Sequence, residues 1–177
     1  MGTHFRGTVA ERAALDAYIK LMRSTVAVNG LLFPPLQAEF GITSTQLGVL
    51  EALSHLGPMA HCALAAKLLV SASNLTTVLD NLERDGLVRR DRDVADRRVS
   101  IASLTPAGET RLAAFFPRHV ARLVGAMSAL DAHELAELGR LCRKLGLHAA
   151  APEPADAPAS ESPDRRITIH NLPQVPS

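Results

Sequence analysis

The chain has 177 residues, the length of one domain or of one domain with an appendage. Apolar residues make up 47% and aromatic residues only 3%, which is typical of a globular protein with an aliphatic core. No stretch approaches the roughly 18 apolar residues of a membrane span, and the first residues lack the pattern of a signal peptide. Two cysteines cannot form a disulfide framework, so we expect a protein of the reducing cytoplasm.

The net charge of +1 hides a local excess of positive charge. Six arginines crowd into residues 84–98: Arg84, Arg89, Arg90, Arg92, Arg97 and Arg98. A basic cluster on a nearly neutral chain indicates contact with a polyanion at one place.

Apolar residues three and four apart predict a first helix over residues 8–33. Pro34 and Pro35 are expected to end or kink this helix, because a proline inside a helix removes a backbone hydrogen bond. A short turn is expected over residues 36–40. We therefore predict that residues 8–42 form a dimerisation helix with a kinked extension, with Leu15 at the dimer contact.

Three short helices and a hairpin follow. Thr43-Ser-Thr-Gln46 has the spacing of a capping box, and Gly57-Pro58 ends the helix that it begins. A second helix is expected over residues 60–69 and a third over residues 71–84. The spacing of apolar residues then becomes nearly alternate, which predicts strands at 87–91 and 99–104 around a polar loop.

The C-terminal part predicts two more helices and a tail. Thr105-Pro106 begins the first, and Asp131-Ala-His-Glu134 caps the second. A heptad-like seam on the second helix predicts further dimer contacts at Leu135, Leu138, Cys142 and Leu145. Residues 109–148 are thus expected to hold dimerisation helices. The Pro/Ala-rich acidic tail, residues 149–177, is expected to be disordered, and its run 167–172 is either a stray apolar stretch or a binding strand.

The order of three helices and a hairpin within residues 43–108 predicts a winged helix-turn-helix DNA-binding domain. The predicted fold class is therefore mainly α with a small β-hairpin wing, on a helical dimerisation base. The third helix buries leucines and a valine, and its opposite face carries small polar residues that suit close approach to base edges. The candidate DNA-binding residues of this helix are Ser71, Ser73, Asn74, Thr76, Thr77 and Arg84. The alternative is an ordinary solvated face.

The hairpin loop carries the candidate wing residues Arg92, Arg97 and Arg98. Long cationic side chains at a hairpin tip can enter a narrow minor groove, where the negative potential is strongest. Asp93 and Asp96 would be repelled by DNA unless paired, so we predict that one or both orient an arginine. The alternative is a salt-bridged surface turn without a partner.

Three stretches resemble the MarR family of bacterial transcription regulators: Thr45-Gln-Leu-Gly-Val-Leu-Glu-Ala-Leu53, Val78-Leu-Asp-Asn-Leu-Glu-Arg-Asp-Gly-Leu-Val88, and Asp96-Arg-Arg98 through Leu104-Thr-Pro-Ala-Gly108. The resemblance implies a homodimer that binds double-stranded DNA at a pseudo-palindromic site, usually as a repressor. It also implies that a small lipophilic or phenolic effector weakens DNA binding. Arg98 falls at the family's wing arginine, whereas Pro34-Pro35 and the tail depart from the family pattern.

Other functions receive less support from the sequence. We assign no catalytic set, metal set or cofactor, and we predict that the chain is not an enzyme. Cys142 is expected to be buried and inert, whereas Cys62 at a helix start is the candidate for an alternative, thiol-redox-responsive regulator. A winged-helix module that contacts only proteins is a further alternative. A guess from position gives the effector pocket Tyr18, Met22, Phe33 and His55.

Overall fold

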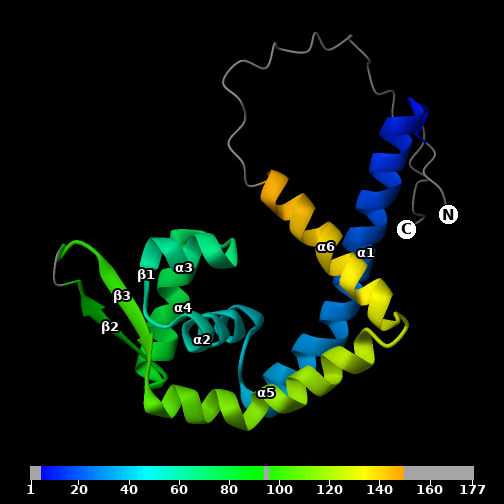
Figure 1. Ribbon diagram of the computed structural model, residues 1–177. Coiled ribbons are helices and arrows are strands. Elements are labelled where there is room, and N and C mark those ends of the chain that lie inside the picture. The colour runs from blue at the N-terminus through cyan, green and yellow to red at the C-terminus, as the bar shows by residue number, and fades with distance from the viewer. Residues whose placement is uncertain (1–4, 94–95, 150–177) are drawn as a thin grey trace, which may run out of the picture. The chain divides into compact units, whose positions relative to one another are not determined.

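The computed structural model describes residues 5–93 and 96–149, and it is mainly helical with one small antiparallel sheet, as predicted (Figure 1). In chain order the elements are α1 (Val9–Phe40), α2 (Ser44–Leu56), β1 (Met59–Ala60), α3 (His61–Leu68), α4 (Ala72–Arg84), β2 (Val88–Arg92), β3 (Ser100–Leu104), α5 (Pro106–Ala126) and α6 (Ala132–Ala149). The chain through Leu130 forms one compact unit, and Asp131 begins a second. The predicted tail, residues 149–177, lies outside the described residues except for Ala149.

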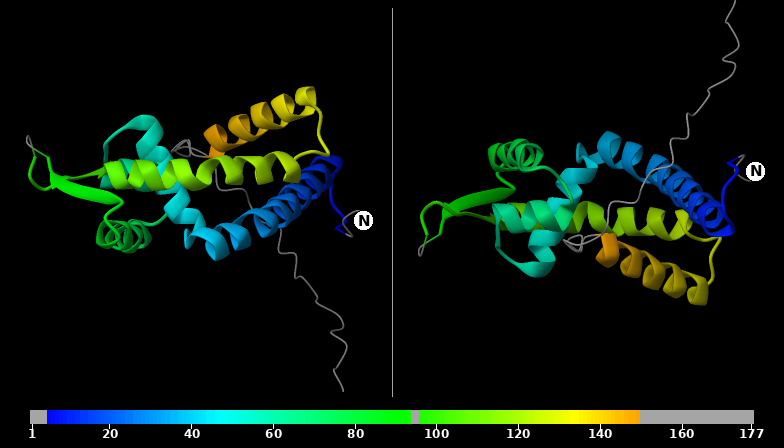
Figure 2. Two further views of the ribbon diagram at one scale, coloured as in Figure 1. Left: turned by 90° about the horizontal axis from the view of Figure 1, so that it is seen from below. Right: turned by 90° about the horizontal axis from the view of Figure 1, so that it is seen from above.

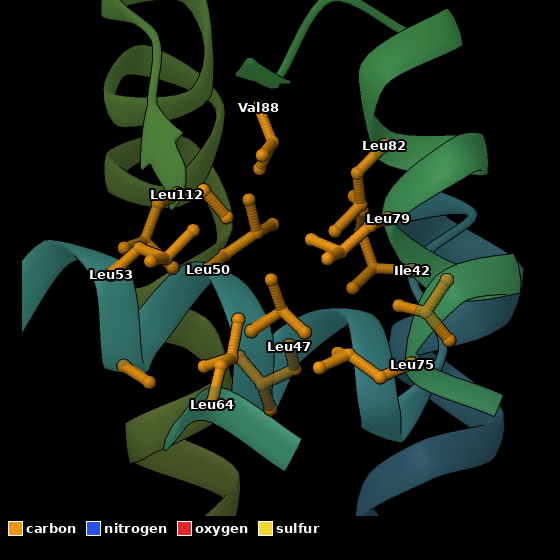
Figure 3. Close-up of a cluster of buried hydrophobic side chains, with 14 of the residues drawn as sticks. Ile42, Leu47, Leu50, Leu53, Leu64, Leu75, Leu79, Leu82, Val88 and Leu112 are labelled. Carbon is orange, nitrogen blue, oxygen red and sulfur yellow. The ribbon is translucent and has the colours of Figure 1, made fainter. Parts of the chain in front are cut away.

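The first unit is built around an aliphatic core between α2, α3, α4, the hairpin and α5. Figure 3 shows the side chains of Leu47, Leu50, Leu64, Leu79 and Val88 converging from four of these elements. Leu50, Leu64 and Leu79 are 0% exposed. Because burying one such side chain contributes about 1.5–3 kcal/mol, this cluster fixes how the three helices meet.

The predicted caps are confirmed where α2, α4 and α5 begin. Thr43 and Gln46 form a reciprocal capping box, and the Ser71 hydroxyl accepts the Asn74 backbone N–H at 3.2 Å. Thr105 caps α5, and Pro106 occupies its first turn. These side chains satisfy amide groups that the helix itself leaves unpaired, so local sequence defines the start of each helix.

Of the two outcomes expected at Pro34 and Pro35, an end or a kink, the end is wrong, because α1 continues through both prolines to Phe40. No turn forms at residues 36–40. Leu32 and Leu36 lie one turn apart and are 4% and 1% exposed, so packing of this face outweighs the lost backbone bonds. The ribbon of α1 bends in its C-terminal part (Figure 2), as a proline-containing helix does.

The sheet has the order β1-β3-β2 and contains one strand, β1, that was not predicted from the sequence. β1 pairs with β3 through Met59 opposite Ala102 and Ala60 opposite Ile101. β2 and β3 form the predicted hairpin, with Val88 opposite Leu104. Because α3 begins directly after β1, this short pairing fastens the start of α3 to the base of the wing.

Gly108 explains why the segment after the wing needs a glycine. A Cβ atom at this position would lie 2.1 Å from the backbone oxygen of Leu87 and 2.8 Å from a methyl carbon of Leu104. The Thr105 hydroxyl donates to the Gly86 oxygen at 2.7 Å, in the same junction. The glycine thus lets α5 pack directly against the chain that enters the hairpin.

The second unit contains α6, whose start is capped as predicted. Asp131 and Glu134 each accept the other's backbone N–H at 2.9 Å. Within the described chain, Leu135, Leu138 and Leu145 are 40%, 36% and 54% exposed. Cys142, expected to be buried, is exposed in this single chain because it belongs to the same uncovered stripe.

Among the described residues, no single helix is long and apolar enough to cross a membrane. One bent pair, α3 with α4 at 108°, passes that test on length and composition alone.

Candidate nucleic-acid interface

Helix α4 has the two faces that the sequence predicts. Leu75, Leu79 and Leu82 are 0% exposed and attach the helix to the core. The proposed DNA-contacting side chains all lie on exposed positions of α4 and of its N-cap: Ser71, Ser73, Asn74, Thr76, Thr77 and Arg84. In the compact unit that contains it, α4 lies beside α3 and next to the hairpin (Figure 1). This is the arrangement of a helix-turn-helix followed by a wing.

Hydrogen bonds within α4 determine which of these side chains still have a free donor or acceptor for DNA. The Thr76 and Thr77 hydroxyls donate to the backbone oxygens of Ala72 and Ser73, at 2.9 and 3.3 Å. Both threonines therefore present mainly a methyl group outward. Among the described residues, the Asn74 side-chain amide has no hydrogen-bond partner, so its donor and acceptor both remain available for a base edge.

An arginine of the basic cluster fastens the hairpin to α4. Arg90 on β2 contacts Asp80 Oδ1 at 2.6 Å, and its Nε donates to Glu83 Oε2 at 3.0 Å. The Arg90 backbone N–H also donates to Glu83. The hydrogen bond from the Arg90 side chain lowers the pKa of Glu83, and that same bond raises the pKa of Arg90. Arg90 is therefore engaged in positioning α4 against β2.

The three candidate wing arginines are exposed: Arg92 ends β2, and Arg97 and Arg98 lie in the loop that follows. Asp96 accepts from the Arg98 backbone N–H at 3.0 Å and from its guanidinium at 3.1 Å, which lowers the pKa of Asp96. The contact expected between an aspartate and an arginine of the wing is present in this pair. Asp93 instead accepts the Asp96 backbone N–H at 2.9 Å and so shapes the turn.

Arg92 and Arg97 have no carboxylate partner among the described residues. Arg92 donates to the Arg97 backbone oxygen at 2.9 Å, which ties the two sides of the loop together. The Arg98 side chain is 92% exposed in spite of its bond to Asp96. Three guanidinium groups thus meet solvent at the tip of the hairpin, where they can approach phosphates.

A recess of about 450 Å³ lies between the start of α3, the exposed face of α4 and the wing. Its lining residues are His61, Cys62, Thr76, Arg90, Arg98, Val99 and Ser100. His61 Nε2 lies 3.1 Å from Thr76 Oγ1. His61 could not be placed at the interface from the sequence, because the pairing of β1 with β3 that brings it there joins residues far apart in the chain.

The four residues guessed for an effector pocket are not brought together. Phe33 lines a recess of about 290 Å³ with Asn29, Ser44, Thr45, Gly48, Leu68 and Val70. Tyr18 and Met22 are 60% and 44% exposed on α1, and His55 is exposed at the end of α2. Of the four predicted residues, Phe33 is the one that lines this recess.

A helix-turn-helix with an exposed polar recognition helix and an arginine-bearing wing defines a winged-helix DNA-binding protein. Residues 42–100 match the model of the MarR family. The uncharacterized HTH-type transcriptional regulator YkoM of Bacillus subtilis is 36% identical over 110 residues, which cover 62% of this chain and 71% of that protein. The chain belongs to the MarR family and is a DNA-binding transcription regulator.

Solved structures share the fold. The MarR family regulator Sco3205 of Streptomyces coelicolor, in complex with DNA, has a TM-score of 0.74 at 23% identity, over 86% of this chain and 96% of that one. BpsR of Bordetella bronchiseptica has a TM-score of 0.67 at 21% identity, over 73% and 98%. Its structure concerns the regulation of its DNA binding by 6-hydroxynicotinic acid.

Proposed function

We propose that the chain is a cytoplasmic, homodimeric repressor that binds a pseudo-palindromic operator and releases it when a small effector binds. The observation that carries the proposal is the exposed polar face of α4 beside a wing with three exposed arginines. The major groove admits a helix of this kind, and the adjacent arginines can reach the flanking phosphates or minor groove. Sco3205, which shares the fold, has been crystallised with DNA.

Two variants separate base reading from phosphate contact. Asn74→Ala removes the unpaired amide from the face of α4, so it should weaken binding to the operator by about 1–3 kcal/mol and leave non-specific binding unchanged. Arg97→Ala should weaken binding to every duplex and reduce the dependence of log K on log salt by about one per protomer. Arg23→Ala, an exposed arginine on α1, is the charge-matched control.

Anisotropy titrations over a range of salt concentrations make this measurement. With about four basic contacts per protomer, the slope of the wild type should be near −7. A flat salt response, or a silent Arg97→Ala, would remove the wing from the interface.

The homodimer rests on apolar surface that the single chain leaves open. On α1, Tyr18, Met22 and Val26 repeat every four residues and are 60%, 44% and 67% exposed. On α6, the stripe at Leu135, Leu138 and Leu145 is exposed in the same way. Exposed apolar helix faces of this kind are ordinarily covered by another protein surface. In a two-fold symmetric dimer, a second copy of the chain covers this face with the same face of its own.

The effector site that we propose is the recess beside Phe33, at the junction of α1 and α2. Its volume of about 290 Å³ suits a single-ring molecule, and Asn29, Ser44 and Thr45 offer polar groups beside apolar walls. BpsR, of the same fold, is regulated by an aromatic acid of that size. A ligand that binds better to the state that cannot hold DNA shifts the population toward that state. Phe33→Ala should abolish release of DNA by such compounds in the anisotropy assay.

A thiol-responsive regulator is the second candidate, because Cys62 is exposed and lines the recess beside the proposed recognition helix. A modified thiol there would stand between α4 and the DNA. Treatment with a thiol-specific alkylating reagent should then block DNA binding of the wild type and spare Cys62→Ser. Cys142→Ser is the matched control, since Cys142 is also exposed.

A further inference from the structure

His61 enters the recess between α3, α4 and the wing as a consequence of the β1–β3 pairing. The residue before it, Ala60, pairs with Ile101, and His61 is the first residue of α3. The opposite walls of the recess are Thr76 on α4 and Ser100 on β3. The imidazole thus lies where the exposed face of α4 meets the wing.

The hydrogen bonds of Thr76 determine which nitrogen of His61 carries a hydrogen. A threonine hydroxyl has one hydrogen, and that of Thr76 goes to the Ala72 oxygen at 2.9 Å. Thr76 Oγ1 can therefore only accept from His61 Nε2, 3.1 Å away. In the neutral ring Nδ1 is then the unprotonated nitrogen. A second proton can add at Nδ1 without breaking the bond that holds the ring in place.

The groups that face His61 are cationic or neutral. Arg90 on β2 contributes a guanidinium that Asp80 and Glu83 largely compensate. Arg98 contributes one that is paired with Asp96 but highly exposed.

The remaining lining groups are the neighbouring Cys62 and the uncharged Thr76, Val99 and Ser100. Among the described residues no carboxylate lines the recess, so the charged side chains of its lining are cationic.

We propose that this recess binds a phosphate of the DNA backbone and that His61 is its titratable contact, which takes up a proton at Nδ1 as the complex forms. The inference rests on the proposed DNA-binding function and adds a contact and a pH dependence to it. In a helix-turn-helix the helix before the recognition helix crosses the backbone, which puts the start of α3 near a phosphate. The phosphate supplies the negative charge that the recess lacks, and the proton comes from solvent.

The sign of the effect follows from this linkage. The protonated form gains a charged hydrogen bond to phosphate, so affinity for duplex DNA rises as pH falls through the range in which histidine titrates, about pH 5–8. Between pH 8 and pH 5.5 or so we expect the wild type to gain about tenfold in affinity per recess. One more neutralised phosphate should also steepen the salt slope by about 0.9 per recess at the lower pH.

The test compares the wild type, His61→Gln and His133→Gln on a duplex of random sequence, because a backbone contact needs no operator. Glutamine can still donate to Thr76 but cannot be protonated. His133 is an exposed histidine on α6 and serves as the matched control. Anisotropy titrations at several salt concentrations near pH 5.5 and pH 8 give both affinity and slope.

We expect His61→Gln to equal the wild type near pH 8 and to lose the gain in affinity and slope near pH 5.5, while His133→Gln behaves as the wild type. If His61→Gln keeps the full pH dependence, the inference is overturned while DNA binding stands. If the wild type binds no duplex at either pH, the proposed function itself has failed. If inorganic phosphate at equal ionic strength produces the same proton uptake without DNA, the site takes a free anion and the assignment to the backbone is wrong.

Discussion

The winged-helix part of the chain and α6 show similar apolar spacing and opposite outcomes. On α4, Leu75, Leu79 and Leu82 recur at three and four residues and are completely buried. On α6 the same spacing is kept by Leu135, Leu138, Cys142 and Leu145, and the three leucines stay 40%, 36% and 54% exposed. The first region completes its own core, whereas the second has an apolar stripe that the single chain does not cover. The winged-helix part therefore buries its apolar residues within one chain, whereas we expect α6 to bury its apolar stripe against a partner.

The largest expected effect lies in the completed core. Leu79→Ala should lower the free energy of unfolding by about 2–5 kcal/mol, because it leaves a cavity among side chains that cannot fully collapse. Thr77→Ala on the exposed face of the same helix should stay within about 0.5 kcal/mol. Urea denaturation measures both, and a loss below about 1 kcal/mol for Leu79→Ala would mean that this core is not as closed as it looks.

The stripe on α6 should respond in assembly. Leu138→Glu places a charge on the surface that we propose to be shared by two copies, and truncation at the centre of an interface commonly costs about 2 kcal/mol or more. We expect monomers in sedimentation velocity. Lys144→Glu reverses a charge on an exposed polar position of the same helix and should leave the dimer intact. A fully dimeric Leu138→Glu would place the dimer contact elsewhere.

A smaller effect is expected at the junction of the wing and α5. Gly108→Ala forces a methyl group toward the Leu87 oxygen, so we expect a loss of about 1–3 kcal/mol. Gly125→Ala, in the last turn of the same helix and in open space, should be neutral or stabilising by up to about 1 kcal/mol. Thermal unfolding of the two variants makes the measurement. Equal melting temperatures for Gly108→Ala and Gly125→Ala would show that the backbone at the junction can move to accommodate the methyl group.

The smallest effect concerns a buried histidine in the first unit. His119 on α5 is 8% exposed, lies between Phe33 and Phe116, and has no hydrogen-bond partner for Nδ1 among the described residues. Burial, and secondarily the charge of Arg122, lower its pKa. The unfolded chain therefore binds a proton that the folded chain refuses, and stability falls as pH drops below about 6.5.

The variant His119→Phe isolates this contribution. When the pH is lowered from about 7.5 to about 5, the urea concentration at the unfolding midpoint should fall less for this variant than for the wild type. His133→Gln, an exposed histidine on α6, should follow the wild type. Parallel pH profiles for His119→Phe and the wild type would show that burial of the imidazole has no cost.

The parts of the fold that sequence predicts are those that neighbouring residues determine. Ser71 and Thr105 cap the helices that they precede, and the apolar spacing of α4 gives its buried face directly. The passage of α1 through Pro34 and Pro35 was not predictable in this way, because it depends on how deeply Leu36 packs against the rest of the unit.

The residues of the candidate site likewise fall into those that local sequence predicts and those that depend on contacts between distant segments. Asn74 and Arg97 could be selected from residue type and position, and the bond between Asp96 and Arg98 spans two residues. His61 could not be selected, since its place next to Thr76 depends on the contact of Ala60 with Ile101 across the sheet. The engagement of Arg90 by α4 likewise appears only once the hairpin is folded.

The proposed operator binding depends most directly on two copies of α4 reading one duplex. Affinity selection of the purified protein against a pool of random duplexes tests this in one experiment. We predict enrichment of an inverted repeat whose half-sites lie about 10 base pairs apart, centre to centre, as two recognition helices on one face of DNA require. Enrichment of no sequence, or of a single half-site without its inverted copy, would contradict it.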